Sequence, residues 1–168
     1  ARLHDLATGL PTLPAVVVYP DGIKGTDHAL SWQGAPYSSP KADDVSFTRQ
    51  ILNTMRSTLC VNRARTLAVG RSNGAGFVAL LSCRMPSEFA AYATVSTAVY
   101  RPSTAGCQGA APVSVIDFHG TNDPVISYGG GIKHGTSYLS ATQWIDSVVR
   151  RGHCASATVT TPLSPVVW

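Results

Sequence analysis

The chain has 168 residues, which fits one domain and is too short for two domains of ordinary size. Hydrophobic residues make up 44% of the chain and charged residues 13%, a globular composition that can bury a core. The 13 Lys and Arg residues are scattered and form no basic stripe with interleaved aromatic residues, so we expect no nucleic-acid partner. No run approaches the roughly 18 apolar residues of a membrane-spanning helix, so we expect no membrane partner.

The first third of the chain is predicted to hold a strand, a long loop and a helix. The β-branched residues at 15–19 are followed by Pro20-Asp21-Gly22, a pattern typical of a strand that ends in a turn. Residues 23–42 are rich in Gly, Pro, Ser and Asp and indicate a long surface loop. Asp43 and Asp44 then precede an apolar stripe at helical spacing, so we interpret them as the acidic first turn of a helix rather than as an acid/base pair.

Strands and helices alternate along the rest of the chain. We expect strands at 66–69, 93–98, 113–118 and 155–161, and helices at 74–84 and 137–151. This alternation predicts an α/β fold with a mostly parallel sheet and helices on both faces. Because no repeat, linker or shift in composition divides the chain, we expect one catalytic domain over residues 1–168.

A G-x-S-x-G sequence joins the strand at 66–69 to the following helix. It runs from Gly70 through Ser72 to Gly74, and its position between a strand and a helix predicts a nucleophile elbow. Such a turn strains the serine backbone, exposes Oγ, and requires glycines where side chains would collide with neighbouring elements. Ser72 is thus the expected nucleophile, and the backbone N–H of Asn73 the expected oxyanion donor. A phosphate-binding loop is the alternative, but the Lys-Ser/Thr ending that it requires is absent.

The acid of a serine hydrolase triad is expected after a strand downstream of the nucleophile. Asp123 lies in the turn after the strand at 113–118, with Asp117 as a weaker candidate, and His119 is expected to brace that turn through a hydrogen bond. The base should follow the next strand, where the sequence has no histidine. We therefore expect the chain to lack its catalytic histidine, with His134 and then His153 as less favoured alternatives.

The four cysteines lie far apart and form no C-x-x-C motif, which argues against a zinc or redox site. We expect disulfides and an oxidising compartment, although spacing alone does not give the pairing. The most plausible pair is Cys83–Cys107, because both residues are expected at the sheet edge opposite the nucleophile. No dinucleotide-binding or metal-ligand spacing is present, so we expect neither a cofactor nor a metal.

Several stretches together resemble fungal feruloyl esterases, in the family that also includes acetylxylan esterases and polyhydroxyalkanoate depolymerases. The matching stretches lie at 16–22, 31–37, 43–45, 59–61, 70–77, 118–123 and 152–154. The resemblance implies an α/β-hydrolase fold, Ser72 as nucleophile, Asp123 as acid, and secretion to the extracellular space. The family's oxyanion loop and its glycine-flanked histidine are not found in the chain, so we expect the domain to be incomplete at both ends, with a further polypeptide segment completing the site.

The resemblance implies hydrolysis of feruloyl or related hydroxycinnamoyl esters on plant cell-wall polysaccharide, through an acyl-enzyme on Ser72. Trp32, Tyr37 and Tyr128 are candidate substrate-binding residues for the aromatic acyl group, although ordinary loop packing would also explain them. An acetylxylan esterase or a polyester depolymerase is the alternative enzyme. A catalytically inactive hydrolase domain that binds polysaccharide is the alternative of another class.

Overall fold

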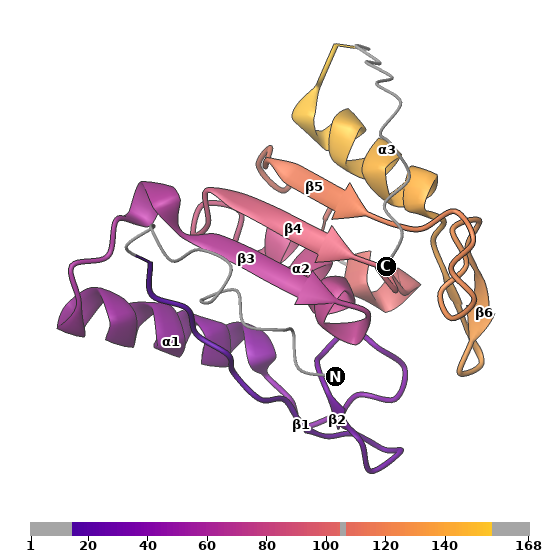
Figure 1. Ribbon diagram of the computed structural model, residues 1–168, viewed down its shortest axis with the longest axis horizontal. Helices are drawn as coiled ribbons and strands as arrows, with labels where there is room; N and C mark the ends of the chain where they lie inside the picture. Colours follow the sequence, from indigo (N-terminus) through magenta and orange to yellow (C-terminus); the bar gives the residue numbers. More distant parts are fainter. Residues whose placement is uncertain (1–14, 105–106, 156–168) are drawn as a thin grey trace.

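The computed structural model describes residues 15–104 and 107–155, which are built around a parallel three-stranded sheet (Figure 1). The strand order is β3 (Leu67–Arg71), β4 (Ala91–Val95) and β5 (Val115–Phe118). In register, Gly70 pairs with Thr94, which pairs with Asp117. The predicted α/β class with a parallel sheet is confirmed.

Three helices accompany the sheet: α1 (Asp44–Thr58), α2 (Asn73–Arg84) and α3 (Ala141–Gly152). Local side-chain caps set where two of them begin. The Asp43 carboxylate accepts the Ser46 amide at 3.1 Å, which confirms that this acid belongs to a helix start. At α3, Ser140 and Gln143 form a reciprocal capping box.

The remaining elements are short. They are two antiparallel hairpins, β1 (Ile23–Lys24) with β2 (Leu30–Ser31) and β6 (Gly131–Lys133) with β7 (Thr136–Tyr138), and two 3-10 turns, η1 (Arg63–Arg65) and η2 (Arg101–Thr104).

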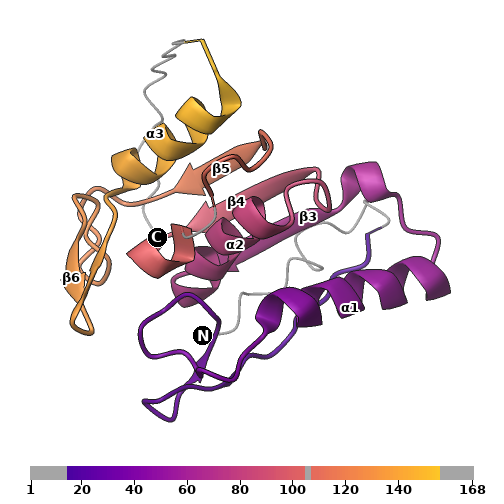
Figure 2. The ribbon, with the colours of Figure 1, turned by 180° about the vertical axis from the view of Figure 1, so that it is seen from behind.

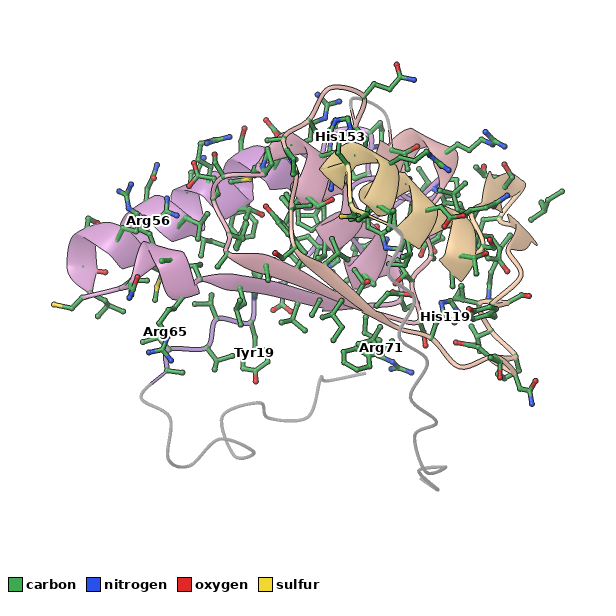
Figure 3. The ribbon with its side chains drawn as sticks, turned by 90° about the horizontal axis from the view of Figure 1, so that it is seen from above. Tyr19, Arg56, Arg65, Arg71, His119 and His153 are labelled. Carbon is green, nitrogen blue, oxygen red and sulfur yellow. A yellow bond between two sulfur atoms is a disulfide. The ribbon has the colours of Figure 1, made fainter. Side chains whose placement is uncertain are left out.

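All three helices cover the same face of the sheet, contrary to the prediction of helices on both faces. Leu52 of α1 packs with Ala68, Tyr92 and the apolar residues of α2, and Trp144 of α3 packs with Ala79 of α2. Figure 2 shows α2 in front of the strands, and Figure 3, seen from above, places the helices on one side of them. α2 lies in the crossover from β3 to the neighbouring parallel strand β4, and α1 and α3 pack against the apolar residues on the same face.

The opposite face of the sheet carries exposed apolar side chains in the described part of the chain. Leu67 is 61% exposed and Phe118 is 55% exposed, and Val69 and Ile116 point the same way as these two. Figure 3 shows Tyr19 and Arg71 on this side as well.

Three predicted elements differ from the structure, and a fourth is not tested by it. Residues 15–19 form no strand, so β-branched composition alone was misleading there. The predicted helix from residue 137 begins at Ala141 instead, because Gly135 turns the preceding residues into the β6–β7 hairpin. β4 ends at Val95 rather than Ala98, because Ser96 adopts a positive φ of 49°. The strand predicted at 155–161 lies almost entirely outside the described residues.

One disulfide joins Cys83, near the end of α2, to Cys107, and so confirms the expected pair. Cys60 and Cys154 are free and exposed. Among the helices that the structure describes, none has the length and apolar character needed to cross a bilayer.

An ion pair ties α1 to the turn before β4. Arg56 donates to Glu88 at 2.6 Å, and the more exposed Arg49 approaches the same carboxylate at 3.3 Å. The pKa of Glu88 lies below its ordinary value, first because of the hydrogen bond from Arg56; burial opposes this lowering, and the nearby arginine charges add to it. The pair therefore stabilises the fold above the ordinary Glu pKa of 4.5, and the contribution is lost as the pH falls through the lower folded-state value.

We predict that Glu88→Gln lowers the free energy of unfolding at neutral pH by about 1–3 kcal/mol, because it removes a charge-assisted hydrogen bond to a side chain that is only 12% exposed. Urea denaturation at neutral pH and at about pH 3 measures this, and the difference between variant and wild type should become smaller at the lower pH. Arg49→Gln is the control and should change stability little, because the Arg49 side chain is 50% exposed. An equal loss at both pH values would contradict this account.

We also predict that peptide mapping without reductant recovers the Cys83–Cys107 bridge, and that alkylation of the native protein modifies Cys60 and Cys154. Replacing both bridge cysteines by serine should cost about 3 kcal/mol, the value expected for a loop of this length. Four alkylated cysteines in the native protein would show that the bridge is absent in solution.

Candidate active site

Ser72 lies in a strained turn between β3 and α2. Its backbone has φ 53° and ψ −120°, a region that non-glycine residues rarely occupy. Gly70 makes this turn possible, since a Cβ there would stand 2.3 Å from the carbonyl oxygen of Gly74. Gly74 itself is different from what we predicted, because its Cβ would meet only the Trp32 ring at 3.8 Å, an ordinary contact. One of the two expected glycine constraints therefore exists in the described structure.

The turn places Ser72 at the carboxyl edge of the sheet, at the N-terminus of α2. The Ser72 amide donates to the carbonyl of Val95 at 2.9 Å, which fixes the turn against the end of β4. As the first residue of the helix, Asn73 has no intrahelical acceptor for its N–H. A free amide and the positive end of the helix dipole beside Ser72 Oγ can stabilise negative charge that develops there.

The Asn73 side chain also binds the backbone of Trp32, a contact that the sequence did not indicate. Its Oδ1 accepts the Trp32 amide at 2.7 Å, and its Nδ2 donates to the Trp32 carbonyl at 3.2 Å. The Trp32 ring stacks on Phe77 of α2 with centroids 5.2 Å apart. This pairing fixes the loop between β2 and α1 directly beside the nucleophile turn.

The buried carboxylate of Asp44 fixes the same loop by accepting the Gln33 amide at 2.6 Å. Burial raises the pKa of Asp44, the hydrogen bond from Gln33 opposes that rise, and the charge of Asp43 adds to it. Asp44 is thus engaged in holding a loop.

Asp123 lies in the loop that follows β5, in the position expected for a triad acid. Its Oδ1 accepts the amides of Val125 at 2.8 Å and Ile126 at 3.0 Å. His119 Nε2 lies 2.8 Å from the Ile126 carbonyl and closes the loop, as we predicted. Oδ2 of Asp123 lies 3.9 Å from the same ring nitrogen, too far for a hydrogen bond.

The Asp123 carboxylate is held in its charged form. Burial pushes its pKa upward, but the amides of Ile126 and Val125, the hydroxyl of Ser96 and the charge of His119 together outweigh burial, so the pKa lies below its ordinary value. The side chain is only 13% exposed, so the carboxylate has a restricted orientation. An ionised and oriented carboxylate with one oxygen still available can accept an imidazole N–H.

Asp117, the weaker acid candidate, is engaged elsewhere. Its Oδ1 accepts the hydroxyls of Thr94 and Thr97, both at 2.6 Å, and both threonines are buried. Asp117 also lines a cavity of about 330 Å³ between the end of β5 and α3. Its contacts fix the segment after β4 to β5.

No histidine side chain in the described part of the chain hydrogen-bonds to Ser72. His119 bonds to the Ile126 carbonyl, and its side chain is only 2% exposed. His134 lies in the β6–β7 turn with its ring 4.5 Å from that of Tyr37. His153 caps α3 in the left-handed conformation, and His28 is exposed.

The three candidate aromatic residues do not share one pocket in the described structure. Trp32 stacks on Phe77, Tyr37 contacts His134, and Tyr128 meets His119 edge-on with centroids 5.8 Å apart. Tyr128 lines the cavity beside α3, whose lining residues include neither Ser72 nor the other two aromatics. Over residues 15–104 and 107–155, no three His, Cys, Asp or Glu side chains gather as metal ligands would.

Comparison with known proteins adds independent information. No family model matches the chain. Several fungal proteins do match, among them feruloyl esterase B of Piromyces equi (32% identity over 70% of this chain), probable feruloyl esterase C of Aspergillus niger (30% over 71%) and feruloyl esterase C of Emericella nidulans (29% over 75%).

The chain spans less than half the length of these relatives, namely 22%, 39% and 42% in the same order. The matched stretch nevertheless covers most of this chain, and the relatives agree in the name they carry. The resemblance to fungal feruloyl esterases that the sequence motifs indicate is therefore confirmed over most of this chain.

Proposed function

We propose that the protein is a secreted serine esterase of the α/β-hydrolase fold that releases ferulic or related hydroxycinnamic acids from plant cell-wall polysaccharide. The observation that carries the proposal is the strained Ser72 turn at the sheet edge, between a parallel strand and the N-terminus of α2. The feruloyl esterase relatives support the ester class. The Cys83–Cys107 bridge supports an oxidising, extracellular location.

In the proposed mechanism, Ser72 Oγ attacks the ester carbonyl and gives its proton to a histidine base. The Asn73 amide donates to the oxyanion of the tetrahedral intermediate, which collapses to an acyl-enzyme as the alcohol leaves. Water, activated by the same base, then releases the acid. A strained serine at a helix N-terminus suits this chemistry and would serve no purpose in a domain that only binds polysaccharide.

Asp123 orients the base in this proposal. Its Oδ1 is occupied by two backbone amides, so Oδ2 remains to accept the imidazole N–H and to stabilise the imidazolium. We place the histidine outside the described residues, because the four histidines in the described part of the chain are engaged or positioned elsewhere. Trp32 and Tyr37 lie in the loop beside the nucleophile turn and are proposed to contact the acyl group. Tyr128 lines a separate cavity and is not included in this proposal.

We predict that a fluorophosphonate probe labels Ser72 in the protein expressed with its natural ends, because the probe reacts with an activated serine hydroxyl. Peptide mapping identifies the labelled residue, and Ser72→Ala should be unlabelled while retaining the same thermal midpoint within a few degrees. Ser82→Ala, which alters a buried structural serine of α2, should leave labelling in place. Labelling of a serine other than Ser72 would overturn the assignment.

We predict that Asp123→Asn lowers kcat for a feruloyl ester by about three to four orders of magnitude, because the amide would favour the wrong imidazole tautomer. Steady-state kinetics with methyl ferulate and an acetyl ester measure this and compare the two ester classes. Asp117→Asn is the matched control. It should lower the thermal midpoint and change kcat little, because Asp117 accepts hydrogen bonds from Thr94 and Thr97. An unchanged kcat with only a raised KM would contradict the role of Asp123.

A further inference from the structure

The Asn73 side chain makes its hydrogen bonds outside its own helix. An asparagine near a helix start commonly bonds to backbone groups of its own first turn. Asn73 bonds across the fold instead, since its Oδ1 accepts the Trp32 amide at 2.7 Å and its Nδ2 donates to the Trp32 carbonyl at 3.2 Å. One side chain therefore binds both backbone polar groups of a residue 41 positions away.

The loop that carries Trp32 is held at two consecutive residues by the first residues of two helices. Asn73 of α2 binds the backbone of Trp32, and the buried carboxylate of Asp44 of α1 accepts the Gln33 amide at 2.6 Å. Asp44 fixes the loop relative to α1, whereas Asn73 fixes it relative to the helix that begins beside Ser72. The distance of Trp32 from the proposed nucleophile thus depends on Asn73.

The Trp32 ring lies against the first turns of α2. It stacks on Phe77 with the two planes 8° apart, and its edge faces Gly74, where a Cβ would stand 3.8 Å from Cδ1 and 3.9 Å from Nε1 of the indole. Gly74 is the second residue after Ser72, and the Trp32 side chain is only partly buried. A flat aromatic surface therefore stands beside the nucleophile turn.

We infer that Asn73, in addition to offering its backbone amide, is a positioning residue whose side chain holds the Trp32 ring beside Ser72 and so favours planar aromatic acyl groups. A hydroxycinnamoyl group can pack on an indole that is already fixed without the entropic cost of ordering the loop, whereas an acetyl group is too small to gain from that surface. The inference rests on the proposed function for its catalytic consequence, but the bonds between Asn73 and Trp32 do not.

Two substitutions separate the hold from the ring. Asn73→Ala removes both bonds to Trp32 and retains the backbone amide beside Ser72. Trp32→Leu retains the backbone groups that Asn73 binds and removes the flat ring. Asn62→Ala is the matched control, because the Asn62 side chain also bonds to a backbone amide, that of Ala64 at 3.0 Å, but caps the turn η1 at the other end of β3.

The first measurement is amide hydrogen exchange at Trp32, followed by NMR in the protein with its natural ends. Exchange should be about 10-fold faster in Asn73→Ala, because the amide loses its acceptor, and unchanged in Asn62→Ala. Asn73→Asp retains an acceptor for this amide and should keep the slow exchange. This measurement requires no esterase activity. Unchanged exchange at Trp32 in Asn73→Ala would overturn the inference, even if the proposed esterase activity is found.

The second measurement is kcat/KM for methyl ferulate and for methyl acetate, whose ratio gives the selectivity for the aromatic acyl group. Asn73→Ala should lower this ratio about 5- to 10-fold, mainly through a higher KM for methyl ferulate, because the binding-competent loop is less populated without one net hydrogen bond. Asn62→Ala should keep the wild-type ratio. In the Trp32→Leu background, Asn73→Ala should not change the ratio further, because Asn73 acts through the ring.

An equal loss for both esters in Asn73→Ala would overturn the inference, since the side chain would then act on the nucleophile turn and not on the acyl group. A full additional loss of selectivity in the Trp32→Leu background would overturn it as well. Wild-type protein without activity on either ester would overturn the proposed function and the selectivity with it, while the exchange at Trp32 would still decide whether Asn73 holds the loop.

Discussion

The close approach of two backbone segments at the start of α2 is the constraint on which the rest of the site depends. Gly70 admits the carbonyl of Gly74, and Gly76 admits the carbonyl of Ala98, where a Cβ would stand only 2.5 Å away. With these contacts, α2 packs directly against the ends of β3 and β4. The turn between strand and helix is consequently short, and a short turn leaves Ser72 no conformation in the common regions of φ and ψ.

The parallel arrangement of the strands brings the turn at Ser72 to the same sheet edge as the residues that follow β4 and β5. Because β3, β4 and β5 run in the same direction, Ser72, Ser96 and the loop that holds Asp123 follow three neighbouring strand ends. The two aspartates near the end of β5 differ in role because of their positions. Asp117 lies within the strand and turns to the helix-covered side, where hydroxyls hold it, whereas Asp123 lies in the loop beyond the strand, among backbone amides.

The two faces of the sheet differ in what covers them. α1, α2 and α3 lie over a single face, where their apolar residues pack in two clusters. β3 and β5 carry apolar residues on both faces, a composition typical of strands covered on both sides. The alternation of strands and helices led to the expectation of helices on both faces, whereas the described residues supply helices on one.

The sequence by itself determined the elements whose signals are local. A strand, a G-x-S-x-G turn and a helix are adjacent in the chain, so their residue types alone predicted the turn at Ser72, and the turn chemistry of residues 119–126 predicted the brace from His119. Only the tertiary structure decided what crosses between elements. The pairing of Asn73 with Trp32 joins residues 41 apart, and the hydrogen bond of Thr94 to Asp117 depends on the register of β4 with β5. Neither has a local sequence signal, because register and crossover geometry are properties of the packed sheet.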